Sequence, residues 1–129
     1  MTVRTPGVVS GNAALDDLRD GWFVGHFMPG PGDPRAASEV EVKWAVYRGG
    51  ERRDGWGRNR AATTLAVLVS GRFRLWFPGR EVLLAAPGDY ALWQPGVPHD
   101  WQAEGPAVVL SVRWPSLAGD SEAVPDPRA

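Results

Sequence analysis

One of the chain's two histidines, His99, stands in a setting suited to ligand binding. It follows a stretch at residues 86–98, APGDYALWQPGVP, in which two Pro-Gly turn signals surround a short apolar run. Pro95 and Pro98 stiffen the loop because the proline ring fixes φ, and a strand starting there would turn His99 and Trp101 to one face. Because imidazole titrates near neutral pH, His99 is the candidate general base of the chain.

The same stretch resembles the second motif of the cupin superfamily, which reads Gly, five residues, Pro, any residue, Gly, two residues, His, three residues, Asn. Gly88, Gly96 and His99 are in register with this motif, whereas Gln94 stands at its proline position and Ala103 at its asparagine position. The resemblance covers roughly residues 39–114 and implies the cupin double-stranded β-helix.

Metal-binding cupins carry a first motif as well: His-x-His, three or four residues, Glu, six residues, Gly. If Gly71 is that glycine, Thr64 stands at the Glu position, and the histidine positions hold Arg58 and Arg60, or Gly57 and Asn59 with the longer spacer. A guanidinium has no free lone pair for a metal, and a single imidazole holds a transition metal weakly. We therefore expect no conventional metal centre and no cofactor.

A relocated metal site is the alternative. His26 is the other histidine, and Glu39 or Glu41 would supply a carboxylate. A set of His26, His99 and Glu41 would have two histidines and one carboxylate, which suits non-haem iron or another divalent transition metal. The simpler interpretation makes His26 a hydrogen-bonded core residue and His99 a residue of the pocket wall.

Aromatic residues near the His99 loop are expected to bind the ligand. Trp93 and Trp101 flank that loop, and Trp56 lies where the resemblance to cupins places ligand entry. Aromatic faces beside polar groups suit stacking on a planar or sugar ring, although the same residues would also serve as packing.

Polar residues complete the expected ligand-binding set. Arg58 and Arg60 would clamp a carboxylate or phosphate if they point inward, and would be solvated otherwise. Thr64 is expected beside them. Lys43 would be a pocket base if its strand turned its polar face inward, but surface pairing with Glu39 or Glu41 is the ordinary explanation.

Short alternating segments separated by Gly and Pro predict β-structure along most of the chain. Strands are expected at residues 22–28, 39–47, 63–69, 73–77, 81–85, 90–93, 99–103 and 108–114. A short helix at 12–19, with Asn12 as its N-cap, is the most helix that the pattern allows. We expect an all-β, jelly-roll-like small barrel over residues 21–114, between a lead-in at 1–20 and a flexible tail at 115–129.

Composition narrows the partners. The formal net charge of −1 gives no reason to expect nucleic acid or an anionic membrane surface as a partner. No apolar run reaches the roughly 18 residues of a membrane-spanning helix, and the absence of cysteine fits a cytoplasmic protein. Because the strand at 63–69 is apolar on both faces and needs cover on both, a homodimer is expected.

The leading hypothesis is a cupin that binds a small organic ligand in its barrel without a conventional metal centre. It would be a metal-free isomerase or cyclase with His99 as base, as its similarity to sugar-nucleotide epimerases among the cupins implies, or an accessory protein of small-molecule metabolism. The alternatives are a metal-dependent oxygenase with relocated ligands and a non-enzymatic ligand sensor. The sequence leaves open whether the protein is an enzyme.

Overall fold

The computed structural model describes residues 7–15 and 19–128. This part of the chain holds one 3-10 turn, η1 (Ala13–Leu15), and ten strands. The strands are β1 (Trp22–Val24), β2 (Glu41–Tyr47), β3 (Trp56–Asn59), β4 (Thr63–Ser70), β5 (Phe73–Phe77), β6 (Arg80–Leu84), β7 (Tyr90–Trp93), β8 (Asp100–Ala103), β9 (Ala107–Trp114) and β10 (Ser121–Val124). The predicted all-β class is therefore confirmed.

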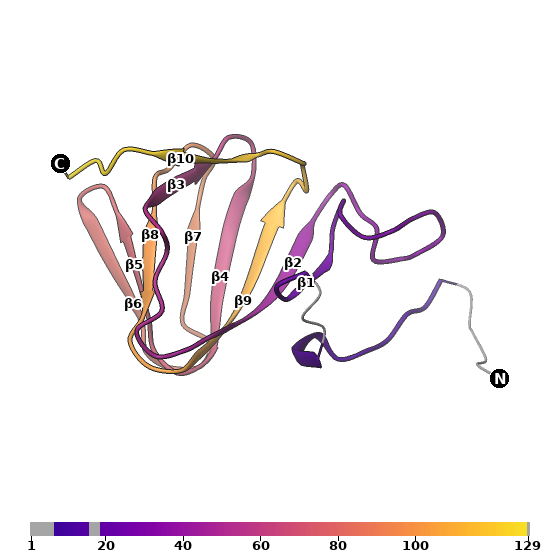
Figure 1. The fold of residues 1–129 in the computed structure, drawn as a ribbon, viewed down its shortest axis with the longest axis horizontal. Helices are drawn as coiled ribbons and strands as arrows, with labels where there is room; N and C mark the ends of the chain where they lie inside the picture. The colour runs from indigo at the N-terminus through magenta and orange to yellow at the C-terminus, as the bar shows by residue number, and fades with distance from the viewer. Residues whose placement is uncertain (1–6, 16–18, 129) are drawn as a thin grey trace.

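The strands form three antiparallel sheets (Figure 1). The largest has the order β1-β2-β9-β4-β7, a second has the order β6-β5-β8, and β10 pairs with β3. The order is not sequential in the largest sheet, where β9 inserts between β2 and β4. Strands far apart in sequence thus become neighbours and bring their side chains to one interior.

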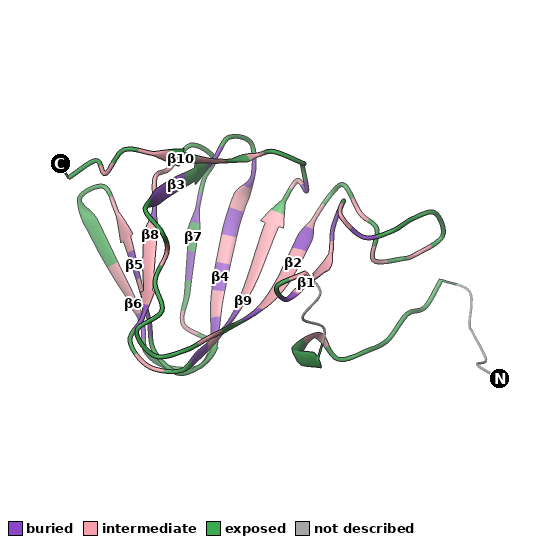
Figure 2. Ribbon diagram, in the orientation of Figure 1, coloured by how far each residue is buried: buried purple, intermediate pink, exposed green. Residues whose placement is uncertain are grey.

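The core lies where the inner faces of the two larger sheets meet. Leu68 and Val109 of the five-stranded sheet and Leu75 and Leu84 of the three-stranded sheet are almost completely buried and belong to one apolar cluster. Along β4, buried and half-buried residues alternate, as expected for a strand with one face on the core (Figure 2). This packing holds the two sheets together around the candidate site.

The N-terminal elements are shorter than the sequence pattern predicts. The Oδ1 atom of Asn12 accepts a hydrogen bond from the Ala14 N–H at 2.9 Å, but the turn that it caps is described only over Ala13–Leu15. Residues 16–18 of the expected helix lie outside the described residues. The strand expected at 22–28 ends at Val24, because the Gly25 N–H turns away to bond the Arg35 carbonyl oxygen at 2.9 Å.

Two strands form where a loop and a frayed tail are expected. β3 lies within the polar segment at 49–60, and β10 lies within the tail at 115–129, so the folded β-structure extends beyond residue 114. Glu122 of β10 pairs with Arg58 and Arg60, while the Asp120 carboxylate accepts hydrogen bonds from the N–H groups of Ala61 and Ala62. These polar contacts, rather than apolar periodicity, join the two strands.

Strand β2 turns its polar face toward the interior and its apolar face outward. The alternation of the sequence would ordinarily indicate the reverse. Glu41, on the polar face, is buried, whereas Val46, on the apolar face, is 64% exposed. The apolar face continues across the sheet, because Trp44 lies opposite Leu110, and Val67 lies opposite both Leu110 and Tyr90. The five-stranded sheet therefore presents an apolar outer face, defined by the row Trp44, Leu110, Val67 and Tyr90 and the parallel row Val42, Val112, Leu65 and Leu92.

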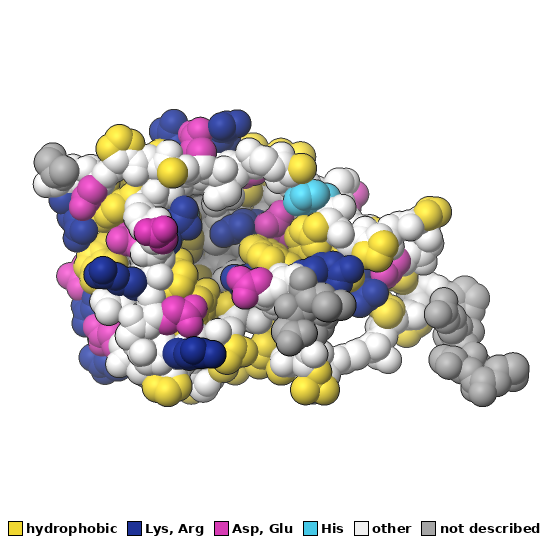
Figure 3. Space-filling view, in the orientation of Figure 1, with side chains coloured by type: hydrophobic (Ala, Val, Ile, Leu, Met, Phe, Trp, Pro, Cys, Tyr) yellow, Lys and Arg dark blue, Asp and Glu magenta, His cyan; other side chains and the backbone are white. Residues whose placement is uncertain are grey.

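The surface in the orientation of Figure 3 mixes both signs of charge, with Lys and Arg side chains lying close to Asp and Glu side chains. Within the described residues, no helix has the length and apolar character needed to cross a membrane.

Candidate functional site

A cavity of about 210 Å³ lies between the two larger sheets. We call it the barrel cavity. Its wall includes His99, and the remaining lining residues are Trp22, Lys43, Tyr47, Arg53, Thr64, Ala66, Phe73, Leu75, Trp93, Trp101, Val109, Ser111 and Arg113. The five-stranded sheet supplies most of the polar members, because the polar face of β2 turns inward.

His99 is 4% exposed, and its backbone exchanges two hydrogen bonds with Gly57 of β3. The Nδ1 atom lies 3.3 Å from the Val97 carbonyl oxygen, so the proton of the neutral ring belongs on Nδ1 and the Nε2 lone pair is left free. Burial, together with the smaller effect of the positive charges of Arg53 and Arg113, lowers the pKa of His99 to about 4. The ring is therefore neutral at pH 7.

Three aromatic rings form one wall of the cavity. Tyr47, Phe73 and Trp101 lie with ring centroids 4.7–5.4 Å apart in each pairing. Burial raises the pKa of Tyr47 to about 12, so its phenol keeps its proton. The wall offers a ligand apolar faces and a neutral hydroxyl.

Three cations line the same cavity. The Lys43 Nζ and the Arg113 guanidinium lie 5.6 and 5.0 Å from the centre of the Trp22 ring. Lys43 also lies 3.5 Å from the exposed Asp20 carboxylate rather than pairing with Glu39 or Glu41, which corrects the surface-pairing interpretation. The Arg53 Nε donates to the Gly55 carbonyl oxygen at 2.9 Å. The barrel cavity is thus rich in positive charge.

Several buried polar atoms of this cavity have no hydrogen-bond partner among the described residues. They are the Thr64 hydroxyl, the Trp93 indole nitrogen and the Arg113 Nε. An unpartnered buried polar atom costs about 1–3 kcal/mol, so native folds rarely leave three in one place. The arrangement is that of a site built for a polar occupant.

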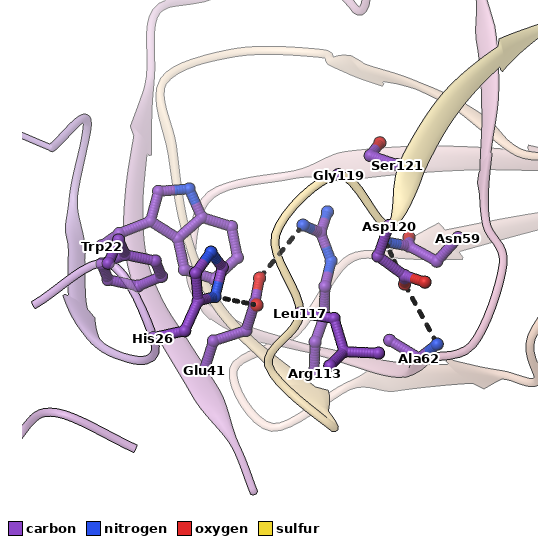
Figure 4. Close-up of a pocket in the computed structure, with 11 residues that line it drawn as sticks. Trp22, His26, Glu41, Asn59, Ala62, Arg113, Leu117, Gly119, Asp120 and Ser121 are labelled. Carbon is purple, nitrogen blue, oxygen red and sulfur yellow. Dashed lines mark hydrogen bonds and ion pairs between the residues drawn. The ribbon is translucent and has the colours of Figure 1, made fainter. Parts of the chain in front are cut away.

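A second cavity, also of about 210 Å³, lies on the other side of Trp22 and Arg113 (Figure 4). The Ser116 hydroxyl accepts from the His26 Nδ1 at 2.7 Å and donates to the Glu41 carboxylate at 2.9 Å. Glu41 in turn lies 3.5 Å from the Arg113 guanidinium. Glu41 therefore contacts Arg113 directly from outside the barrel cavity, whereas His26 contacts Glu41 and Ser116.

Two alignments to the cupin first motif are possible, and the one with the longer spacer agrees with the burial pattern of β3. Gly57 and Asn59 are buried along β3, whereas Arg58 between them is exposed. Arg58 and Arg60 point outward and bind Glu122, with the Nε of Arg58 donating at 2.6 Å and that of Arg60 at 2.9 Å. Neither lines the barrel cavity; of the two alternatives, the structure has the outward one, a surface ion-pair cluster with Glu122.

The residues present do not fit a transition metal. Gly, Asn and Thr at the first-motif positions leave His99 as the one strong ligand. The members of the relocated set lie apart, because His26 and Glu41 line the second cavity whereas His99 lines the barrel cavity. Within the described residues, no group of three His, Cys, Asp or Glu side chains is placed to hold a metal ion.

Other expected site residues divide between the cavity and the core. His99, Thr64, Trp93 and Trp101 line the barrel cavity together. Trp56 does not line it; this residue is buried, with the Arg128 guanidinium 4.9 Å from its ring centre. The sequence analysis missed Arg53, Arg113, Tyr47 and Trp22. The signal for Tyr47 was its position on the same strand face as Lys43.

Comparisons with known proteins agree with this architecture. A family model described as a cupin domain matches residues 43–113. A conserved protein with a double-stranded β-helix domain from Klebsiella pneumoniae is similar at a TM-score of 0.61 and 22% identity, over 70% of this chain and 74% of that one. A cupin protein from Bacteroides fragilis is similar at a TM-score of 0.57 and 20% identity, over 69% and 75%.

The DMSP lyase DddQ from Ruegeria pomeroyi is similar at a TM-score of 0.62 and 18% identity, over 74% of this chain and 48% of the lyase. Identities this low carry information on fold alone. They confirm the predicted double-stranded β-helix. No curated protein matches the chain.

Proposed function

Because this chain belongs to the cupin superfamily, we propose that it binds a small organic ligand in its barrel cavity, without a conventional metal centre. The supporting observation is the cluster of unpartnered buried polar atoms on Thr64, Trp93 and Arg113 around the neutral His99. A bound ligand would satisfy atoms whose burial otherwise costs free energy.

His99 gives the site its chemistry. Its neutral ring has a free Nε2 lone pair, which takes a proton from a hydroxyl or an acidic C–H of the ligand. Returning that proton to a neighbouring atom completes an isomerisation with no net change in composition. If the ligand has no such proton within reach, the same pocket acts as the binding site of an accessory protein.

The aromatic wall supports a role in binding a planar ligand. Tyr47, Phe73 and Trp101 offer a continuous apolar surface beside His99. The cavity volume of about 210 Å³ is below the 300–1,000 Å³ typical of pockets for drug-sized ligands, so the ligand is small.

We propose that a second copy of the chain covers the apolar outer face. Two rows of apolar side chains on that face are too extensive for a monomer in water. We also propose that the protein acts in the cytoplasm, since the chain uses no cysteine.

The experiment is a two-dimensional ¹H–¹⁵N spectrum of the seven tryptophan indole groups during titration with a library of small organic acids, amides and alcohols. A ligand of the cavity shifts the Trp93 and Trp101 signals while leaving Trp114, on the outer face, unchanged. A library in which no compound shifts the Trp93 or Trp101 signal contradicts ligand binding in this cavity. Turnover of the compounds that bind then separates an enzyme from an accessory protein.

A further inference from the structure

We propose that the ligand of the barrel cavity is a small organic anion, whose carboxylate is held by Arg53, Arg113 and Lys43. The inference rests on the proposed function of the cavity and names its ligand class. In this account the three cations supply the positive charge at the site, and no metal ion is needed to attract the anion.

The balance of charge in the barrel cavity favours an anion. Lys43, Arg53 and Arg113 line the barrel cavity, whereas no Asp or Glu among the described residues does. The acids nearest two of these cations, Asp20 and Glu41, lie outside the lining. Within the described residues Arg53 makes no ion pair, so the cavity carries uncompensated positive charge that favours an anion.

The unpartnered polar atoms of the cavity wall are mainly hydrogen-bond donors. The Trp93 indole N–H and the Arg113 Nε–H are donors only, and both are buried without a partner among the described residues. Guanidinium and ammonium groups likewise only donate. An occupant must therefore bring acceptor oxygens, and a carboxylate brings two of them with the matching charge.

The Arg53 guanidinium lies where a side chain at position 57 would otherwise stand. A Cβ at position 57 would collide with the far end of the Arg53 guanidinium. Position 57 corresponds to the first histidine of the metal-binding cupin motif with the longer spacer. In this chain the space beside it is filled by a guanidinium, so a fixed cation takes the place of a metal ligand.

His99 adds an acceptor to the wall of the same cavity. Its free Nε2 is an acceptor in a cavity otherwise dominated by donors. An anion that also carries a hydroxyl group or an acidic C–H would match both kinds of group. The ligand class is therefore a small hydroxy- or oxo-carboxylate with an apolar or aromatic body that contacts Trp101.

The test compares benzoate with benzamide, which has the same shape without the charge, and with 3-hydroxybenzoate, which adds a donor for His99. Each compound is titrated into ¹⁵N-labelled protein while the Trp93 indole and Arg113 Nε signals are followed. We expect benzoate to bind at least about ten-fold more tightly than benzamide, and 3-hydroxybenzoate to bind more tightly still.

Matched variants locate the charge. Gly57→Ala displaces the Arg53 guanidinium, and Lys43→Met removes an ammonium while keeping an unbranched apolar side chain. Each variant is expected to weaken benzoate binding by about five-fold or more and to leave benzamide binding unchanged. Arg58→Gln, on the outer side of β3, is the control and is expected to change neither.

The outcomes are distinct. Equal or tighter binding of benzamide at Trp93 overturns the anion inference and leaves the cavity as a ligand site. Benzoate binding that is insensitive to both Gly57→Ala and Lys43→Met also overturns the inference. No shift of the Trp93 signal by any of the three compounds at about 20 mM, a concentration at which even weak millimolar binders respond, counts against both the inference and the proposed function.

Discussion

The Arg53 guanidinium lies in the space that a side chain at position 57 would occupy, because Gly57 has none. The backbone of Gly57 is also paired with His99, with N···O distances of 2.8 and 3.0 Å. A single glycine therefore places a cation and the candidate base next to each other. Burial is the main cause of the lowered pKa of His99, and the positive charge of Arg53 acts in the same direction.

Thr64 provides a test that separates function from stability. Its side chain is 2% exposed, and its hydroxyl has no partner among the described residues. Thr64→Val removes the unpartnered hydroxyl at nearly constant shape, so the free energy of unfolding should rise by about 1 kcal/mol while ligand affinity falls. Urea denaturation at one fixed protein concentration measures the change.

Thr63→Val, on the outer face of the same strand, is the matched control and should alter ligand affinity little. A Thr64→Val protein that is less stable than the parent would mean that the hydroxyl has a partner in the folded protein.

His99 predicts a pH dependence of stability. Its pKa is about 4 in the folded protein and 6.5 when unperturbed, so the unfolded chain takes up a proton first as the pH falls. The stabilisation is complete above pH 6.5 and is lost as the pH falls through about 4. At pH 4.5 the loss should be about 2–3 kcal/mol relative to pH 7, in addition to what the carboxyl groups contribute.

His99→Gln removes this component, so the difference between the two proteins isolates it. The Cε1–H signal of His99 in a proton NMR titration gives the pKa directly. A midpoint for His99 near 6.5 would contradict the burial of a neutral imidazole.

Asp120 is predicted to fasten β10 to the rest of the fold. Its carboxylate accepts hydrogen bonds from the Asn59 side-chain amide and from the N–H groups of Ala61 and Ala62, at 3.3, 2.8 and 3.1 Å. Asp120→Ala should lower the free energy of unfolding by about 2–4 kcal/mol. Hydrogen exchange should show loss of protection at 121–124.

Asp126→Ala is the control, because the exposed Asp126 carboxylate bonds to Arg128 and to the Trp56 side chain rather than to the backbone of Ala61 and Ala62, and its loss should lower the free energy of unfolding much less. Equal effects of the two substitutions would refute the fastening role of Asp120.

The apolar outer face predicts a homodimer. Tyr90 and Leu92 are 67% and 50% exposed at the edge strand β7, and they end the two apolar rows of the five-stranded sheet. The parent protein should sediment as a dimer at about 10 μM, and Tyr90→Glu with Leu92→Glu should convert it to a monomer, because buried charge is costly. Val8→Glu, at an exposed valine that belongs to neither apolar row, should leave the dimer intact. A monomeric parent protein would contradict the prediction.

Much of the fold was predictable, because short runs of β-forming residues between Gly and Pro turns mark β4 to β9 locally. β3 and β10 were not, because the groups that join them, Arg58, Arg60, Asp120 and Glu122, are polar and separated by about half the chain. Hydrophobic periodicity carries no information about such pairs.

The site was predictable only where a loop motif fixed it. His99, Trp93 and Trp101 follow from the spacing of the Pro-Gly turns. The place of Lys43 in the cavity depended on which face of β2 turns inward, and alternation alone does not decide between the two faces. A shift of one residue in the register of β3 would likewise turn Arg58 inward in place of Gly57, and the sequence does not fix that register.

We propose above all that the barrel cavity works without a conventional metal centre. Elemental analysis after incubation with Fe(II), Mn(II), Ni(II) or Zn(II) and desalting tests it most directly, because the donors at Gly57, Asn59, Thr64 and His99 include one imidazole and no carboxylate. We predict well under about 0.1 equivalent of each metal per chain, unchanged in His99→Ala. Retention of about one equivalent per chain, lost in His99→Ala, would contradict the account.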